Sequence, residues 1–222
     1  MIKVASFLAM LSAAALSAAQ VDINDSVTNY AILNGSKMVG QHETSTSHVA
    51  YRGANVIYIQ QKTQMFDEDG SIGSETMLQT WITPAGQPIT SVQTILTGGV
   101  RNRSTAEFEP NKIKLSDSDG NFRVVAMNDT KSLFGTSIQP LIQQGALIKE
   151  KREFYGLNFK DGSLVKGAIT YIGDTTIMLQ GSSVHVREID STVSNQTTKT
   201  FIGDDGKPVL IMLANGLTMM PN

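Results

Sequence analysis

The chain has 222 residues, with 18 lysines and arginines against 20 aspartates and glutamates, three histidines and no cysteine. The formal net charge of −2 and the lack of a basic cluster exclude nucleic acid as a partner, because binding phosphates requires many convergent cations. The absence of cysteine excludes disulfides and the thiol on which a lipoprotein is acylated, so we expect the fold to be stabilised by core burial alone.

The first segment, residues 1–19, has the pattern of a secretory signal peptide. Lys3 gives it a positive start, residues 4–16 are apolar apart from two serines, and Ser17-Ala18-Ala19 offers small residues for cleavage. No later segment approaches the roughly 20 apolar residues that cross a membrane as a helix. We therefore expect a signal peptide over 1–19, export to the periplasm or the extracellular medium, and no transmembrane segment in the rest.

Short turns rich in aspartate and glycine recur along the remaining chain. Glycine accepts the positive φ of tight hairpin turns, and aspartate caps the backbone of its own turn. The flanking segments are rich in strand-forming residues, and some alternate apolar with polar side chains, as a strand with one buried face does. The turns are 67–70, 83–86, 117–120, 160–162 and 204–206, and the expected strands are 56–61, 77–82, 89–96, 112–115, 122–127, 164–171, 175–180, 184–187 and 209–213.

One central segment has a different pattern. Ser137 is a helix N-cap residue, apolar residues follow at helical spacing from Ile138 to Ile142, and Gly145 ends the run. We expect a short helix there, joining two β-rich parts. The sequence thus predicts an all-β, mainly antiparallel fold, a large curved sheet or half-barrel with one short central helix, formed by a single domain over residues 20–222.

One hairpin occurs twice, 120 residues apart. The segment QTWITPAGQPITSV at 79–92 aligns with KTFIGDDGKPVLIM at 199–212, with an aromatic residue, a turn glycine and a proline in the same places. We expect the two copies to take corresponding places in two parts of one sheet. Trp81 and Phe201 should then lie on the same side and be at least half buried, since large aromatic side chains on strands pack against the core.

Three histidines, His42, His48 and His185, are the candidate metal ligands. Zinc requires three or four converging ligands, and the spacing of these histidines matches no local zinc motif. Solvent-facing histidines on strands are the simpler interpretation. We therefore nominate no catalytic residue, no cofactor-binding residue and no metal ligand, and we expect no cofactor.

Two local motifs resemble functional ones but fit a turn and a strand better. Asp117, Asp119 and Asn121 place oxygens at alternating positions, yet the glycine and glutamate of a calcium-binding EF-hand loop are missing. Ser163 and Lys166 match the S-x-x-K motif of penicillin-interacting enzymes. That motif needs a helix, whereas on the predicted strand the two side chains point to opposite faces.

The order of these features resembles a known group of proteins. The relevant segments are YAILNG at 30–35, MVGQ at 38–41, the Trp81 to Pro88 strand pair, PLI at 140–142, VHVR at 184–187 and DDGKP at 204–208. Over most of residues 28–219 this pattern is similar to exported bacterial β-rich domains of uncharacterised function, akin to the half-barrel lipoprotein carriers. The resemblance implies a curved sheet around an apolar cavity, lidded by short helices, and it implies no catalytic residues.

These observations predict an exported, non-enzymatic β protein that binds or carries an apolar, lipid-like ligand on a concave face. The ten methionines agree with that function, since methionine adapts to apolar partners of varied shape, although it also fills ordinary cores. The alternative is a structural or protein-interaction component of the cell envelope that pairs through its β-edges. A hydrolase is the third alternative, and it would need Ser, His and Asp side chains within hydrogen-bond reach in a cleft.

Overall fold

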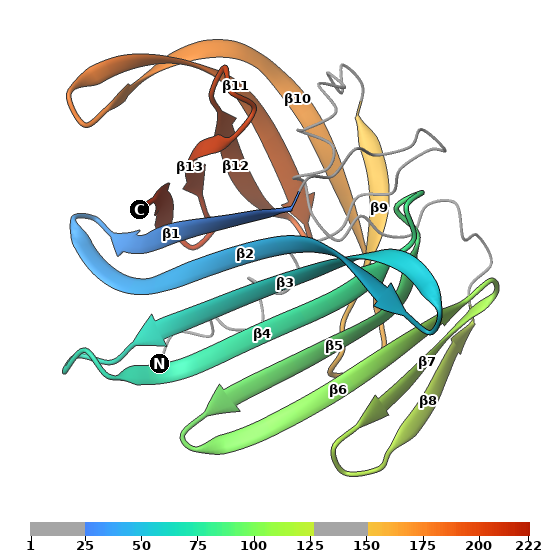
Figure 1. The fold of residues 1–222 in the computed structure, drawn as a ribbon. Helices are drawn as coiled ribbons and strands as arrows, with labels where there is room; N and C mark the ends of the chain where they lie inside the picture. Colours follow the sequence, from blue (N-terminus) through green and yellow to red (C-terminus); the bar gives the residue numbers. More distant parts are fainter. Residues whose placement is uncertain (1–24, 127–150) are drawn as a thin grey trace.

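The computed structural model describes residues 25–126 and 151–222, which form strands and the turns between them. Fourteen strands build one antiparallel sheet (Figure 1). The strands are β1 (Ser26–Asn34), β2 (Lys37–Tyr51), β3 (Ala54–Phe66), β4 (Ile72–Ile82), β5 (Pro88–Thr97), β6 (Val100–Glu109), β7 (Lys112–Asp117), β8 (Phe122–Ala126), β9 (Arg152–Leu157), β10 (Leu164–Leu179), β11 (Ser182–Val193), β12 (Gln196–Ile202), β13 (Pro208–Met212) and β14 (Thr218–Pro221).

The strand order divides the sheet into two meanders. β1 to β8 follow one another in chain order, as do β9 to β14, and the meanders join where β1 pairs with β14. In that ladder Ile32 lies beside Met219. β8 and β9, which come one after the other along the chain, are therefore the two outer edges of the sheet.

The predicted fold needs correction. The expectation of a curved sheet or half-barrel with one short central helix is wrong in the extent of the sheet and in the helix. The described residues form one large open sheet of fourteen strands, whose two ends meet, and they contain no helix. The segment expected to be helical, 137–144, lies outside the described residues. The sheet is larger than predicted because polar segments such as β2 and β6 also belong to it. Pairing of the backbone with two neighbouring strands does not require apolar side chains.

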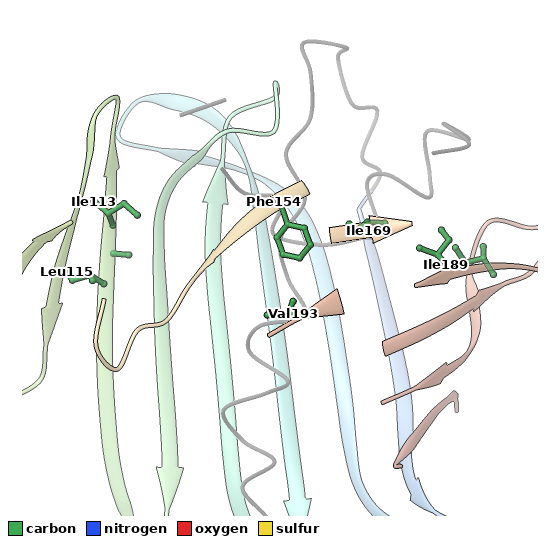
Figure 2. Packing of buried hydrophobic residues seen from close by; sticks show 8 residues of the cluster. Ile113, Leu115, Phe154, Ile169, Ile189 and Val193 are labelled. Atoms are coloured by element: carbon green, nitrogen blue, oxygen red, sulfur yellow. The ribbon is translucent and has the colours of Figure 1, made fainter. Parts of the chain in front are cut away.

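The sheet curls until its two ends pack against each other. Each neighbouring pair of strands adds a twist of about 20–25°, which accumulates across the sheet. Ala106, Ile113 and Leu115 of β6 and β7 consequently share one buried cluster with side chains from the other end of the strand order (Figure 2). Those side chains are Phe154, Ile169, Ile189, Val193 and Ile202. The face that carries this cluster is the concave face, and the place where the two ends meet is called the seam below.

Side chains, and not a strand ladder, close the seam. Among the described strands β8 pairs with β7 alone and β9 with β10 alone. Arg123 of β8 reaches across, where its Nη1 donates a hydrogen bond to the Asp161 carbonyl oxygen at 3.0 Å. Gly162 lies so close to Leu115 that an added Cβ would be 3.0 Å from the leucine Cδ1. The result is an open, barrel-like sheet.

The repeated hairpin has the same geometry in both places. β4–β5 and β12–β13 each contain a register shift directly after the aromatic residue, which is Trp81 in the first copy and Phe201 in the second. Gly86 and Gly206 have φ values of 81° and 78°, a region that glycine adopts without strain. Phe201 is buried and Trp81 is partly buried, which confirms that both are at least half buried.

Gly167 offers a test of the packing at the seam. It lies opposite Phe154 in the β9–β10 ladder, and an added Cβ would clash with the phenylalanine ring at Cζ. Gly167→Ala should lower the free energy of unfolding by about 1–3 kcal/mol, because the ring cannot move without disturbing the cluster. Denaturant unfolding measures this change. Gly156→Ala is the matched control, since its added Cβ would meet nothing nearer than 3.9 Å, and equal losses in the two variants would contradict this account.

Candidate functional site

The concave face is the candidate site, and the ladder register identifies its side chains. Residues directly opposite each other in an antiparallel ladder point to the same face. One continuous row, starting at the seam cluster, runs through Leu115, Ala106, Ser91, Thr80, Ile59 and Thr46. In the other meander Thr200 lies opposite Ile189 of the same cluster, so β12 also presents its threonines to the concave face.

Uncharged polar side chains line much of this face. The buried ones, called the polar band below, are His42, Thr44, Thr46, Thr63, Thr76, Thr80, Ser91, Ser191, Thr198 and Thr200. Apolar clusters flank them, one formed by Ile57, Ile59 and Ile82 and another by Tyr30, Ile32, Leu213, Leu217 and Met219. No Asp, Glu, Lys or Arg is among the buried polar residues of the described chain. The concave face is therefore amphipathic, where the sequence suggested an apolar one.

His42 lies within the polar band and is held by two threonines. Its Nδ1 is 2.8 Å from Thr63 Oγ1, and its Nε2 is 3.0 Å from Thr44 Oγ1. Burial lowers the pKa of His42 from 6.5 to about 4, because the charged imidazolium loses its hydration there. The imidazole is thus neutral at neutral pH, with one ring nitrogen donating a hydrogen bond and the other accepting one.

Two threonines on the same face of β4 differ in their hydrogen bonding. Thr80 Oγ1 lies 3.0 Å from Ser91 Oγ, so these two hydroxyls satisfy each other. Thr76 Oγ1 is buried and has no hydrogen-bond partner within the part of the chain that the structure describes. A buried hydroxyl without a partner costs about 1–3 kcal/mol. Thr76 is therefore a group that a bound molecule could satisfy.

The fold does not bring the three candidate metal ligands together. His42 contacts threonines, whereas the exposed His48 and His185 each contact a carboxylate. The His48 Nδ1 to Asp25 Oδ1 distance is 2.8 Å, and the His185 Nδ1 to Asp204 Oδ1 distance is 3.2 Å. Across residues 25–126 and 151–222 there is no group of three or more His, Cys, Asp or Glu side chains that could hold a metal ion.

The aspartate-rich motif at 117–121 forms a turn that its own side chain caps. Asp117 Oδ1 accepts hydrogen bonds from the backbone N–H groups of Asp119 at 3.0 Å and Asn121 at 2.9 Å. These bonds lower the pKa of the Asp117 carboxyl, together with a side-chain bond from Asn121 that contributes most. The oxygens of this carboxylate are thus engaged within the turn.

The S-x-x-K residues do not meet either. Ser163 Oγ donates a hydrogen bond to Asp161 Oδ1 at 2.6 Å, within the turn between β9 and β10. Lys166 lies 2.7 Å from Glu153 Oε2 on the neighbouring strand. A nucleophile and a base in an enzyme must be within hydrogen-bond reach of each other, so this pair does not form the site of a penicillin-interacting enzyme.

The convex face carries an aromatic cluster that the sequence did not reveal. Thr80 and Thr200 belong to the concave face, so the residues that follow them, Trp81 and Phe201, both point to the convex face. This confirms that the two aromatic residues lie on the same side. Tyr51, at the end of the β2–β3 hairpin, stacks on Trp81 with the ring centroids 5.4 Å apart. Trp81 therefore anchors a hairpin tip, which is a structural role.

The fold and the concave face together define an open, barrel-like all-β protein whose buried polar side chains, within the described residues, are uncharged. No family model matches the sequence, and no curated protein is similar to it. Among solved structures the chain is similar to the crystal structure of a β-barrel-like protein of a domain of unknown function, DUF1849, from Brucella abortus. The identity is 10% and the TM-score 0.50, and the match covers 89% of this chain and 94% of that one. At this identity the likeness concerns the fold alone.

A second solved structure, a DUF1089 family protein from Pseudomonas aeruginosa, has 9% identity and a TM-score of 0.33 over 82% of this chain and 88% of that one. A score this low supports no argument about a shared fold. The first likeness agrees with the β-rich domain of unknown function that the sequence resembles, and export stays a prediction. Within the described residues no helix is long and apolar enough to cross a membrane.

Proposed function

We propose that this protein is an exported, non-enzymatic binding protein of the bacterial envelope, and that it holds a neutral, amphipathic, lipid-like molecule against its concave face. The observation that supports this most directly is the uncharged polar band. A neutral head group finds donors and acceptors there, whereas a buried ion would be left without a counter-charge, at a large cost in free energy. The two flanking apolar clusters suit the apolar part of the same molecule.

The surroundings of His42 also favour binding over hydrolysis. In a hydrolytic triad one ring nitrogen of the histidine contacts a carboxylate and the other contacts the nucleophile. Both ring nitrogens of His42 contact threonine hydroxyls, and the lowered pKa of its imidazole makes it a poor base at neutral pH. His42 therefore serves better as a neutral hydrogen-bonding group than as a catalytic one.

The proposal is tested with protein purified from its own host. Lipid extraction and native mass spectrometry should find a bound neutral lipid. In a separate titration with two fluorescent probes of equal chain length, a monoacylglycerol should bind about tenfold more tightly than a fatty acid anion. A preference for the anion, or the lack of both an extracted lipid and probe binding, would rule out this function.

The two threonines of β4 give a matched pair of variants. Thr76→Val should leave the stability of the ligand-free protein unchanged or raise it, because the hydroxyl that is removed has no protein partner. Thr80→Val should lower the free energy of unfolding by about 1 kcal/mol, because it leaves Ser91 without its partner. Thermal unfolding measures both changes. Monoacylglycerol binding should fall for Thr76→Val. If Thr76→Val lost as much stability as Thr80→Val, the Thr76 hydroxyl would have a partner within the protein and would not be available to a ligand.

A second function is favoured by a separate observation. β9 pairs with residues 164–169 of β10, and no described strand pairs with the same edge over residues 170–179. A free edge of this length can accept a strand from an envelope protein, which is the alternative that the sequence raised. Photo-crosslinking from position 176 in host envelopes tests it, because a single abundant adduct would support pairing and the absence of any adduct would exclude it.

A further inference from the structure

Five hairpins that are neighbours in the sheet carry an exposed apolar side chain at the same rim. The turns of β1–β2, β3–β4, β5–β6 and β7–β8 lie at one end of the strands, since turns in a meander alternate between the two ends (Figure 1). The β13–β14 turn joins them, because Thr218 of β14 lies opposite Leu33 at the end of β1. The exposed residues, called the apolar rim, are Met38, Ile72, Val100, Phe122 and Met212, and their exposed fractions range from 41% to 62%.

The position of these side chains is regular. Ile72, Val100 and Phe122 are each the first residue of the strand that follows the turn. The opposite rim differs, because Met178 is the one exposed large apolar residue close to its described turns. The other exposed large apolar residues, Val27, Val124 and Ile172, lie along strands away from the turns. The apolar character therefore belongs to one rim and not to the surface in general.

The spacing of the apolar rim fits a lipid surface better than a protein. Neighbouring hairpins are offset by two strands, or about 9–10 Å, and polar turns stand between the apolar side chains. They are therefore separate protrusions, whereas the centre of a protein interface is a continuous, closely packed patch. A bilayer interface is fluid and accepts each side chain independently.

Charge indicates which lipid surface suits the rim. The charged residues in or next to these turns are of both signs and include Lys37, Asp67, Glu68, Asp69, Arg101, Asp117, Asp119 and Arg123. Attraction of a basic surface to anionic lipids contributes about 1 kcal/mol per cation, and this mixed set provides no such excess. A zwitterionic surface is therefore the better match.

We propose that the apolar rim docks the protein onto zwitterionic phospholipid by shallow insertion of its side chains, chiefly Ile72, Val100 and Phe122. The phospholipid surface is a different partner from the ligand proposed for the concave face, and docking to it does not require that ligand. Flotation with phosphatidylcholine vesicles tests this proposal. The protein is purified after export by its host, and mass spectrometry verifies that the wild-type protein and every variant have the same N-terminus. The wild-type protein should float with the vesicles.

Two triple variants distinguish docking through the apolar rim from non-specific adsorption through any exposed apolar side chain. The variant Ile72→Ser, Val100→Ser and Phe122→Ser should reduce the vesicle partition coefficient about tenfold or more, because three apolar side chains are removed from the lipid. The matched variant Val27→Ser, Val124→Ser and Met178→Ser removes equally exposed apolar groups elsewhere and should change it less than about twofold. As a second measurement, the fluorescence of Val100→Trp should shift to shorter wavelength when vesicles are added.

Several results would overturn the docking proposal. These are failure of the wild-type protein to float, flotation confined to phosphatidylglycerol vesicles and reversed by high salt, and equal losses in the two triple variants. Unchanged flotation together with an altered oligomeric state of the rim variant would instead assign the rim to a second copy of the chain. Monoacylglycerol binding to the rim variant is measured separately, so failure of the docking proposal and failure of the binding function can be told apart.

Discussion

Phe154→Ala should lower the free energy of unfolding by about 3–5 kcal/mol, the range observed when a large aromatic residue is removed from a core. Phe154 is 3% exposed and lies in the cluster that joins the two ends of the sheet (Figure 2). No strand ladder among the described residues holds these ends together, so the seam depends on side chains of this kind. Denaturant unfolding monitored by circular dichroism gives the measurement.

Phe122→Ala is the matched control for the same change of side chain. Phe122 belongs to the edge strand β8 and is 62% exposed, so its replacement should change the free energy of unfolding by less than about 0.5 kcal/mol. If both variants lost similar stability, or if Phe154→Ala were neutral, the cluster would not be what closes the seam. A change in the denaturant dependence of Phe154→Ala alone would indicate that the ends of the sheet separate before the rest unfolds.

Strands were predictable where side chains alternate and turns contain Asp-Gly or Pro-x-Gly, but not where strands are polar. β2 reads KMVGQHETSTSHVAY and β6 reads VRNRSTAEFE, and neither presents enough apolar residues to be recognised as a strand. Their pairing comes from neighbours that are distant in sequence. The β2–β3 turn was missed for another reason, since its central residues are Arg52 and Gly53, and arginine rarely adopts the φ of 51° that this turn requires.

The polar band was not predicted because threonine both favours strands and offers a hydroxyl group for hydrogen bonding, and the sequence pattern indicates only the strand. As a β-branched residue it indicates a strand, so Thr80 fell within the expected strand 77–82 and Thr76 just outside it, but the sequence does not specify whether this face is buried. Burial of that face depends on curling of the sheet through all fourteen strands. His42 could not be separated from His48 for the same reason, although one is buried and the other exposed.

The repeated hairpin accounts for the open edge. Because β4–β5 and β12–β13 share their register shift and turn, the strands from β1 to β6 correspond in order to those from β9 to β14. β14 pairs with β1 at the junction of the two meanders, so the equivalent closing pair would be β6 with β9. In the structure β7 occupies that edge of β6, followed by β8. Because the additional β7–β8 hairpin occupies this edge, β6 and β9 do not pair through their backbones, and the two ends of the sheet meet through side chains at the seam instead.

Acidification should destabilise the protein through His42, by about 3 kcal/mol in total. Its pKa is lowered from 6.5 to about 4 by burial, so between these values the unfolded chain binds a proton that the folded protein does not. Stability is therefore complete above about pH 6.5 and falls as the pH drops towards about 4. Carboxyl groups whose pKa is lowered by hydrogen bonds, such as Asp25 and Asp117, add losses at lower pH.

The free energy of unfolding, measured by urea denaturation at a series of pH values, isolates this effect. His42→Gln can still hydrogen-bond to Thr44 or Thr63 but cannot take up a proton, so its stability should be nearly constant from about pH 6.5 to 4.5. His185→Gln removes an exposed histidine and should keep the fall seen for the wild-type protein. If instead His42→Gln kept that fall, the proton uptake would belong to another group. The account of His42 as a buried imidazole that stays neutral in the polar band would then lose its support.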